Sequence, residues 1–517
     1  MSIEEFKTPF EIQLDKRNRW VTLADMIPWD NLAGIYCKNL STDRGAPTVD
    51  ARIVIGAMII KHKLGLDDRE TIETIRENVY MQYFLGLSNY TYDDVFDRSL
   101  FTALRYRMGA EKFDAMSCEL IKSAEEKKSV SKKSTSKEKD PDENNPPAEK
   151  EEPEVPPKNK GKLLLDATVA DQMIVYPTDL GLLARSREES ERLIDILCKK
   201  LGTAKKPRTY RKKARKLYLN VAKMKHKTRK QIHKAIGQQL RFLQRNLKST
   251  HKLLDQFQGQ EFPLKKRDQK IFFVIQHIFD QQMQMYKTGA NSIEHRIVNI
   301  YQPYVRPIVR GKDKSKVEFG SKLSVSLNNG YNRLNKLSWD AFNESIDLRK
   351  QAEDYNKLNG FWPDVVIADQ IYGTQENRKW LKERGIRFSG KSLGRPPKEQ
   401  LSPYQKRKQK FEQRMRNQIE GKFGQGKNAY DLNRVRTRTA RTSESWIACI
   451  FFVMNLIKIQ KDFLSSLFIW LKKCLPEALN GLPQLKMPSF APTDCRDIEN
   501  MNNRGRGILP PIRFVLD

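Results

Sequence analysis

The sequence predicts an α/β fold, in which a mixed sheet flanked by helices is joined to an all-helical N-terminal domain and a helical basic insertion. After residue 161, short apolar runs that suit strands alternate with helical patterns, which is typical of a mixed sheet. The first 121 residues show helical periodicity. A strongly basic helical stretch, residues 185–294, interrupts the strand patterns. The length of 517 residues agrees with about three domains.

Composition indicates a polyanionic partner inside the cell. The chain has 95 Lys and Arg residues against 63 Asp and Glu, a net charge of +32, and proteins this basic bind nucleic acid or anionic membranes. The most apolar stretch, residues 446–459, is shorter than the ~20 residues of a membrane span, so we expect a buried helix there. The six cysteines include no CxxC pair, and MSIEEFKTPF lacks an apolar signal core, so we expect no zinc ribbon, disulfide scaffold or secretion.

Residues 1–121 are predicted to form a compact helical domain. The apolar positions of RIVIGAMIIKHKLGL, after Asp50, suit a buried helix. A second helix is predicted for TIETIRENVYMQYFLGL after Asp67, and a third from Tyr92 through Leu104. Short helices separated by polar turns are typical both of a helix-turn-helix DNA-binding domain and of a plain scaffold, and the pattern favours neither.

Residues 122–161 are predicted to be a disordered linker. They contain six prolines and only four apolar residues, with no Leu, Ile or aromatic among them. Such a segment cannot bury enough surface to offset the entropy of ordering it. We therefore expect it to separate two independently folded regions.

The α/β domain begins after this linker. Its first segment, LLLDATVADQMIVYPTDLGLL, predicts two short strands, one ending at Asp166 and one at residues 174–176. Later predictions alternate: strands within 297–327, a helix at 340–358, a strand in PDVVIADQIYGT, a helix in ENRKWLKERG and a strand in IRFSG. The predicted boundaries are the catalytic core at 162–184 and 295–462, the insertion at 185–294 and a C-terminal tail at 463–517.

A block of positive charge lies within the insertion. From Lys199 to Lys252 there are 20 Lys and Arg residues and no Asp or Glu. The ordinary interpretation of a charge run is a solvated helix face, but such a face usually mixes signs. We therefore favour contact with DNA or phosphate. The predicted DNA-binding residues of this block are Arg211, Lys212, Lys213, Arg215 and Lys216.

Two acids occupy similar positions in the predicted core. Asp166 follows KLLL and Asp369 follows VVIA, so each ends an apolar strand, where carboxylates can converge on a metal ion. A turn or a helix cap is the ordinary role of a lone Asp in such a place. A third acid is needed to favour the metal-binding interpretation.

That third acid lies in RMRNQIEGKFGQGKNAY. On a helix, Glu420 lies about 40° and Lys427 about 20° around the axis from Arg416, so the three share one face. An acid flanked by two cations suits a site that binds metal and phosphate together, although an ordinary surface ion pair has the same spacing. The three glycines of this stretch, each costing about 1 kcal/mol of helix stability relative to Ala, permit close approach of the backbone to a ligand.

These three blocks, in this order, resemble those of the DDE transposases of bacterial insertion sequences, in the branch whose third block reads Tyr-x2-Arg-x3-Glu-x6-Lys. Arg416, Glu420 and Lys427 fit that spacing, whereas Gln413 stands where the branch has tyrosine. Residues 20–107 resemble the N-terminal helical domain of the same branch. EFGSKLSV resembles the strand between the first and second acids.

The resemblance implies a ribonuclease H-like fold and the chemistry of DNA transposition. The catalytic acids would be Asp166, Asp369 and Glu420, which would hold two Mg²⁺ ions, with Mn²⁺ as a possible substitute. Arg416 and Lys427 would bind backbone phosphates. Hydrolysis would expose a 3′-OH that attacks target DNA. The long gap between the first two acids implies the insertion domain. No ATP is needed, and the sequence has no GxxxxGK[ST] loop.

Other acids near the blocks are expected to have local roles. Asp171 is expected in a turn, Asp179 as a helix cap, Asp364 at the wrong end of its strand and Glu376 in a first helical turn. Lys322 in EFGSK is a possible phosphate contact.

The expected partners are the element's DNA ends and target DNA, with a homodimer in the synaptic complex and no membrane. The expected location is the bacterial cytoplasm at the nucleoid. The alternatives are another ribonuclease H-like nuclease or integrase, and a non-catalytic DNA-binding protein derived from a transposase. Terminal inverted repeats beside the gene would favour the mobile element.

Overall fold

The computed structural model describes residues 14–38, 40, 48–134, 159–203, 205–257, 261–309, 317–390, 393–394 and 402–474. The chain divides into two compact units, Met1–Gln460 and Lys461–Asp517. All described strands lie in the first unit, as do all described helices except the end of the last one.

The N-terminal part is helical, as predicted. Asp50 and Asp67 begin two of its helices, since their side chains accept backbone N–H groups of the first turn, and Asp67 forms a capping box with Glu70. Its helices are α1 (Arg19–Met26), α2 (Trp29–Cys37), α3 (Ala51–Leu64), α4 (Asp68–Glu77), α5 (Val79–Phe84), α6 (Leu100–Arg107) and α7 (Ala110–Ser134).

Two predicted helix boundaries in this part were wrong. The second predicted helix is divided at Asn78, whose side chain accepts the amide of Met81 and so begins α5. The third helix begins at Leu100 rather than Tyr92. The buried Gln82 side chain donates a hydrogen bond to the carbonyl of Thr91 and accepts one from its amide. These bonds hold the start of the segment between α5 and α6 as a loop.

Helix α7 extends into the region predicted to be a linker. It continues to Ser134, so residues 122–134 are helical, while the remainder of the predicted linker from 135 to 158 lies outside the described residues. Phe113 at its start packs on Phe452, with ring centroids 5.9 Å apart. Residues 122–134 include five lysines and two glutamates, which favour helix by intrinsic propensity.

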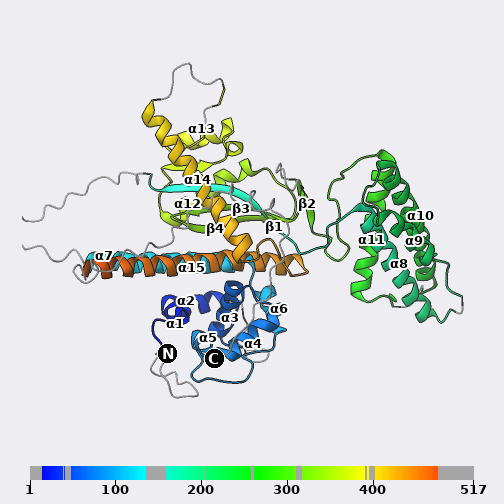
Figure 1. The fold of residues 1–517 in the computed structure, drawn as a ribbon, viewed down its shortest axis with the longest axis horizontal. Coiled ribbons are helices and arrows are strands. Elements are labelled where there is room, and N and C mark those ends of the chain that lie inside the picture. The colour runs from blue at the N-terminus through cyan, green and yellow to red at the C-terminus, as the bar shows by residue number, and fades with distance from the viewer. Residues whose placement is uncertain are drawn as a thin grey trace, which may run out of the picture. The chain divides into compact units, whose positions relative to one another are not determined.

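A six-stranded mixed sheet confirms the predicted α/β class. The strand order is β2-β3-β1-β5-β6, and β4 pairs with β3 beside β2. β1 is antiparallel to β3 and parallel to β5, an order consistent with a ribonuclease H-like core (Figure 1). The strands are β1 (Lys162–Asp171), β2 (Arg306–Val309), β3 (Val317–Asn328), β4 (Tyr331–Ser338), β5 (Val365–Ala368) and β6 (Arg387–Phe388).

β1 is one long strand, not the two short strands predicted. Asp166 lies in its middle, and residues 174–176 form no strand. The strand continues because β3 pairs with it as far as Asp171, opposite Gly320. A Cβ atom on Gly320 would lie 1.8 Å from the carbonyl oxygen of Ala170, so only glycine allows this approach.

The strands around residue 320 also differ from the prediction. Residues 297–304 form no strand, and β4 was not predicted. β4 is the second arm of a hairpin whose turn, Asn329-Gly330, has positive φ at both residues, the preferred chemistry of a two-residue hairpin turn. The helix predicted at 340–358 begins later, at Asp347, after a short 3₁₀ turn, η3 (Glu344–Ile346).

Helices cover both faces of the sheet. On one face, Leu163 and Leu165 pack with buried residues of α12 (Asp347–Asn359) and α13 (Gln375–Glu383). On the other, Leu164 and Ile367 share a core with α14 (Pro403–Ala429), α15 (Ala440–Cys474) and the N-terminal helices (Figure 1). The apolar stretch 446–459 is thus a buried helical segment, as predicted. Among the described residues, no helix combines the length and apolarity that crossing a membrane requires.

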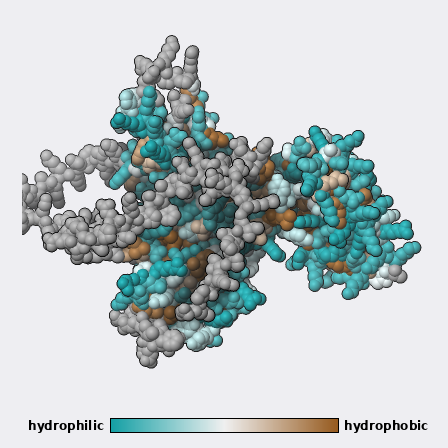
Figure 2. All heavy atoms as spheres, viewed as in Figure 1, coloured by the Kyte–Doolittle hydropathy of each residue, from teal (hydrophilic) through white to brown (hydrophobic). Residues whose placement is uncertain are grey.

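The insertion between β1 and β2 is helical and has its own buried core. Its first helix begins at Asp179, before the predicted start at residue 185, because Thr178 caps it by accepting the amide of Gly181. Figure 2 shows that the visible surface of these helices is largely hydrophilic. The helices are α8 (Asp179–Leu201), α9 (Arg211–Ala222), α10 (Arg229–Leu254), the 3₁₀ turn η2 (Asp255–Phe257) and α11 (Lys266–Thr288).

Candidate active site beside the end of strand β5

Strand register brings Asp166 and Asp369 to the same level of the sheet. β5 pairs with only the first half of β1, and its last residue, Ala368, lies opposite Leu165. Asp166 directly follows Leu165, and Asp369 directly follows Ala368. Because neighbouring strands are about 4.8 Å apart, the two acids lie side by side. Asp369 also caps the 3₁₀ turn η4 (Gln370–Tyr372) by accepting the amide of Gln370 at 2.7 Å.

Helix α14 adds the third acid through Arg416. The guanidinium of Arg416 lies 3.0 Å from the Asp369 carboxylate and 3.0 Å from that of Glu420. The three residues therefore meet where β5 ends. Lys427 lies two turns further along α14, where its ammonium is 3.5 Å from Glu318 and 3.9 Å from Asp171.

The glycines of α14 have a simpler explanation than ligand contact. The helix is continuous through all three. A Cβ on Gly426 would meet Leu432 at 3.1 Å and Met454 at 3.5 Å, so this glycine permits packing against the protein itself. At Gly421 and Gly424, nothing lies within 4 Å of an added Cβ among the described residues.

Asp166 differs electrostatically from the other two acids. Its pKa is raised to about 6, chiefly by burial and also by the charges of Glu344 and Glu420, while the hydrogen bond from the Ala167 amide and the charge of Arg416 lower it. Asp369 and Glu420 have half-exposed side chains. The site thus combines one partly buried acid of raised pKa with two acids that remain in contact with water.

The donor chemistry fits a divalent ion such as Mg²⁺. The three groups are carboxylates, Mg²⁺ prefers oxygen ligands, and half-exposed acids allow it to keep several waters. Within the described part of the chain, no group of three His, Cys, Asp or Glu side chains is arranged to hold a metal. Arg416 lies between Asp369 and Glu420, so its side chain must move before both acids can share an ion.

Two residues near this site were not recognised in the sequence. Glu344 acts electrostatically on Asp166, and Tyr372 is fully buried beside both. Lys322, a predicted phosphate contact, instead pairs with Glu344 at 2.8 Å and donates to the carbonyl of Phe342 at 2.8 Å. Glu344 lies within residues 340–358, which were predicted to be helical, and no sequence signal distinguished it from a surface acid of that helix.

Two of the four neighbouring acids have the local roles predicted for them, and two do not. Asp364 directly precedes β5, and Glu376 lies in the first turn of α13. Asp171 ends β1 instead of lying in a turn. Asp179 is the first residue of α8, not its cap, and it accepts hydrogen bonds from Gln282 and Arg296.

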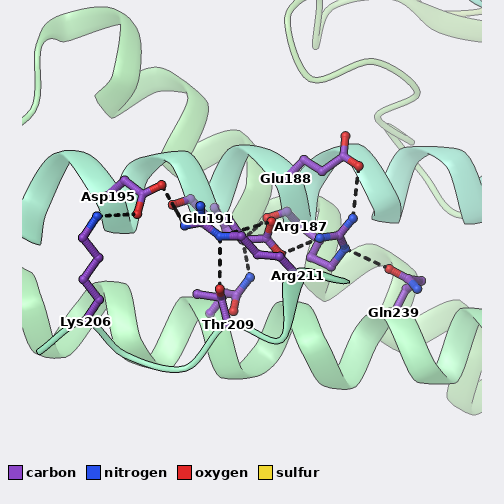
Figure 3. Close-up of polar contacts among 10 residues, drawn as sticks. Arg187, Glu188, Glu191, Asp195, Lys206, Thr209, Arg211 and Gln239 are labelled. Carbon is purple, nitrogen blue, oxygen red and sulfur yellow. Dashed lines mark hydrogen bonds and ion pairs between the residues drawn. The ribbon is translucent and has the colours of Figure 1, made fainter. Parts of the chain in front are cut away.

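The basic block contains two kinds of residue. Arg211 is paired with Asp195 of α8 at 2.7 Å and donates to the carbonyl of Glu191 (Figure 3). Lys206 pairs with Asp195 as well, at 3.3 Å. The basic block contains no acid of its own, but Asp195 of the preceding helix α8 pairs with two of its cations. A buried side chain, Arg187, bonds Glu191 and Gln239 in the same network.

The other cations of α9 face solvent. Lys212, Lys213, Arg215 and Lys216 are exposed, and no carboxylate of the described chain forms an ion pair with them. Three of them line one shallow hollow on the helix together with Lys223. We call this set the α9 stripe; it consists of Lys212, Arg215, Lys216 and Lys223.

Comparisons with known proteins match two separate parts of the chain. Residues 366–457, which include Asp369 and the α14 residues of the site, match the family described as "Transposase DDE domain". Residues 8–107 match the "Transposase domain (DUF772)". The chain is also similar to the "Uncharacterized protein ORF8 in nfe locus" of Rhizobium meliloti, with 26% identity over 180 residues, which cover 34% of this chain and 73% of the relative. No solved structure matches. The two family matches support a DDE transposase of an insertion sequence.

Proposed function

We propose that the protein binds the terminal inverted repeats of its element and catalyses metal-dependent strand cleavage and strand transfer at Asp166, Asp369 and Glu420. The observation that carries this proposal is the convergence of the three acids, from two parallel strands and one helix, around Arg416. The match to a transposase DDE domain supports the same reaction class.

The chemistry would be phosphoryl transfer from DNA. When bound, two Mg²⁺ ions would stabilise the charge on the attacking and leaving oxygens. The three carboxylates would hold these ions, Asp166 only after losing its proton. Arg416 and Lys427 would then bind the DNA phosphates beside the acids, in exchange for their present carboxylate partners. Because the nucleophiles are water and a DNA 3′-OH, no ATP enters the proposed reaction.

Several parts of the chain would hold the DNA. The α9 stripe offers four cations along one helix face, which suits a row of phosphates. The N-terminal helices, residues 1–121, would add a second DNA-binding region, supported by the transposase family matched there. Since two element ends must be cut together, we propose a homodimer in the synaptic complex.

Cleavage of a labelled element end, with flanking DNA, tests the proposal. Asp166→Asn, Asp369→Asn and Glu420→Gln should each abolish Mg²⁺-dependent cutting while DNA binding persists, because phosphate contacts supply most of the affinity. Asp364→Asn, which changes an exposed acid at the opposite end of β5, is the control and should cut normally. A variant of one of the three acids that cut at the wild-type rate would remove that acid from the site.

A further inference from the structure

We propose that Glu344 is a fourth carboxylate of the divalent-cation site, acting beside Asp166. This inference rests on the proposed function, since it concerns the same ions. It is based on the place of Glu344 in the fold, on the charged side chains around it and on the unpartnered hydroxyl of Tyr372 near Glu344 and Asp166.

The fold fixes Glu344 to the turn that carries Asp369. Glu344 is the first residue of η3, and η3 packs against η4, which Asp369 caps. The buried side chain of Asn377 joins the two turns by donating to the carbonyl of Ser345 at 2.7 Å and to that of Tyr372 at 2.9 Å. Glu344 is therefore held by the same short segments as a predicted metal ligand.

A buried hydroxyl lies among the acids. Tyr372 is completely buried, and its hydroxyl has no hydrogen-bond partner among the described residues. The negative charges of Glu344 and Asp166 act on this hydroxyl, which keeps its proton at neutral pH and is therefore a hydrogen-bond donor. An unused donor is costly in a packed interior. A carboxylate rearranged around an ion, or a water on that ion, would give it an acceptor.

The carboxylates at the site outnumber the basic side chains that contact them. Four carboxylates meet there, Asp166, Glu344, Asp369 and Glu420, and they contact two basic side chains, Arg416 and Lys322. Two negative charges remain when all four acids are ionised, so the site attracts a divalent cation. Asp347, the next acid along the chain, is already paired with Lys336 at 3.0 Å.

The ordinary interpretation of Glu344 is a structural ion pair with Lys322. Both side chains are largely buried, at 18% and 15% exposure, and Lys322 also lies 4.9 Å from the ring of Phe342. A purely structural pair would affect stability but not metal affinity. The two interpretations therefore differ in a measurable quantity.

The test is calorimetric titration of the full-length protein with Mn²⁺, with melting temperature measured on the same samples without metal. Glu344→Gln keeps the shape and a hydrogen bond to Lys322 but removes the charge, and it should weaken Mn²⁺ binding about tenfold or more. Glu376→Gln, which changes an exposed acid of α13, is the matched control and should bind as the wild type does. Asp369→Asn reports on the proposed site as a whole.

Each outcome decides between the interpretations. Wild-type Mn²⁺ affinity in Glu344→Gln, with weakened binding in Asp369→Asn, would overturn the fourth carboxylate and leave the proposed function intact. Unchanged affinity in both variants would overturn the proposed function itself. If Glu344→Gln does not fold, the double variant Lys322→Gln/Glu344→Gln removes both charges and should fold, and its Mn²⁺ affinity then decides in the same way.

Discussion

Arg416 joins Asp369 to Glu420, with 3.0 Å between its guanidinium and each carboxylate. One acid comes from the end of a strand and the other from the same helix as the arginine, one turn later. The Arg416 guanidinium therefore lies where a metal ion shared by Asp369 and Glu420 would bind. Metal binding and release of Arg416 are therefore linked, and a DNA phosphate offers the arginine a new partner.

Replacing Arg416 should separate metal binding from cleavage. Arg416→Gln removes the competing cation, so Mn²⁺ should bind the DNA-free protein several-fold more tightly, while cleavage of an element end should fall because one DNA phosphate has no cation to bind it. Calorimetry and a cleavage assay measure the two effects. Arg414→Gln, which changes an exposed neighbour on α14, should leave both unchanged. Weaker metal binding in Arg416→Gln would contradict the linkage.

The raised pKa of Asp166 predicts a pH dependence with a definite sign. Its carboxyl keeps a proton up to about pH 6 in the folded protein, whereas the ordinary value is 3.8. The folded state thus binds more protons between these values, so the free energy of unfolding falls as pH rises from about 4 to about 6. Asp166→Asn should be more stable than the wild type above pH 6, by up to about 3 kcal/mol. Urea unfolding at pH 4 and pH 7 measures this, and equal differences at both pH values would contradict it.

Salt dependence should distinguish the α9 stripe from Arg211. Changing Lys212, Arg215, Lys216 and Lys223 to Gln should weaken DNA binding and reduce the slope of log affinity against log salt by about 0.9 for each phosphate that the variant no longer neutralises. Specific and random DNA should be affected alike, because phosphates carry no sequence information.

Arg211→Gln is the comparison for the stripe. Since Arg211 is held by Asp195 and the Glu191 carbonyl, this change should lower the melting temperature of the insertion and leave the salt slope nearly unchanged. DNA affinity at several salt concentrations and calorimetric melting report the two effects. A slope that falls with Arg211→Gln but not with the stripe variant would reverse the assignment.

Two glycines should respond oppositely to alanine. Gly320→Ala places a Cβ 1.8 Å from the Ala170 carbonyl oxygen, so it should separate β1 from β3 and cost about 3 kcal/mol or more. Gly424→Ala lies in open space on α14 and should stabilise the protein by about 1 kcal/mol, the difference in helix propensity. Chemical denaturation measures both. A tolerated Gly320→Ala would show that the two strands can move apart at little cost.

The sequence predicted site residues best where a local pattern of apolar or charged residues also fixes their place in the fold. Asp369 could be located because an apolar strand stops beside it, and the α14 residues because a helix repeats its faces. β1 was misjudged because Asp166 interrupts the apolar run, while the pairing that continues the strand comes from β3. β4 could have been predicted from the Asn329-Gly330 turn.

Other features depend on residues that are distant in the sequence. Arg211 looked unneutralised because its partner Asp195 lies on the preceding helix, outside the basic run. Glu344 and Tyr372 are brought to Asp166 by packing between the short turns η3 and η4, which are distant from each other in the sequence. Such contacts depend on the tertiary fold, so they could not be predicted from composition or from the spacing of residues in the sequence.

The separate core of the insertion has an evolutionary consequence. The helices α8, α10 and α11 bury their apolar side chains mainly against one another, whereas the N-terminal helices share a core with the sheet. A substitution inside the insertion therefore leaves the packing behind the carboxylates intact. We therefore expect changes to the buried side chains of the insertion to be tolerated more readily during evolution than changes to those of the N-terminal helices. The side chains of the N-terminal helices must fit the sheet that they cover.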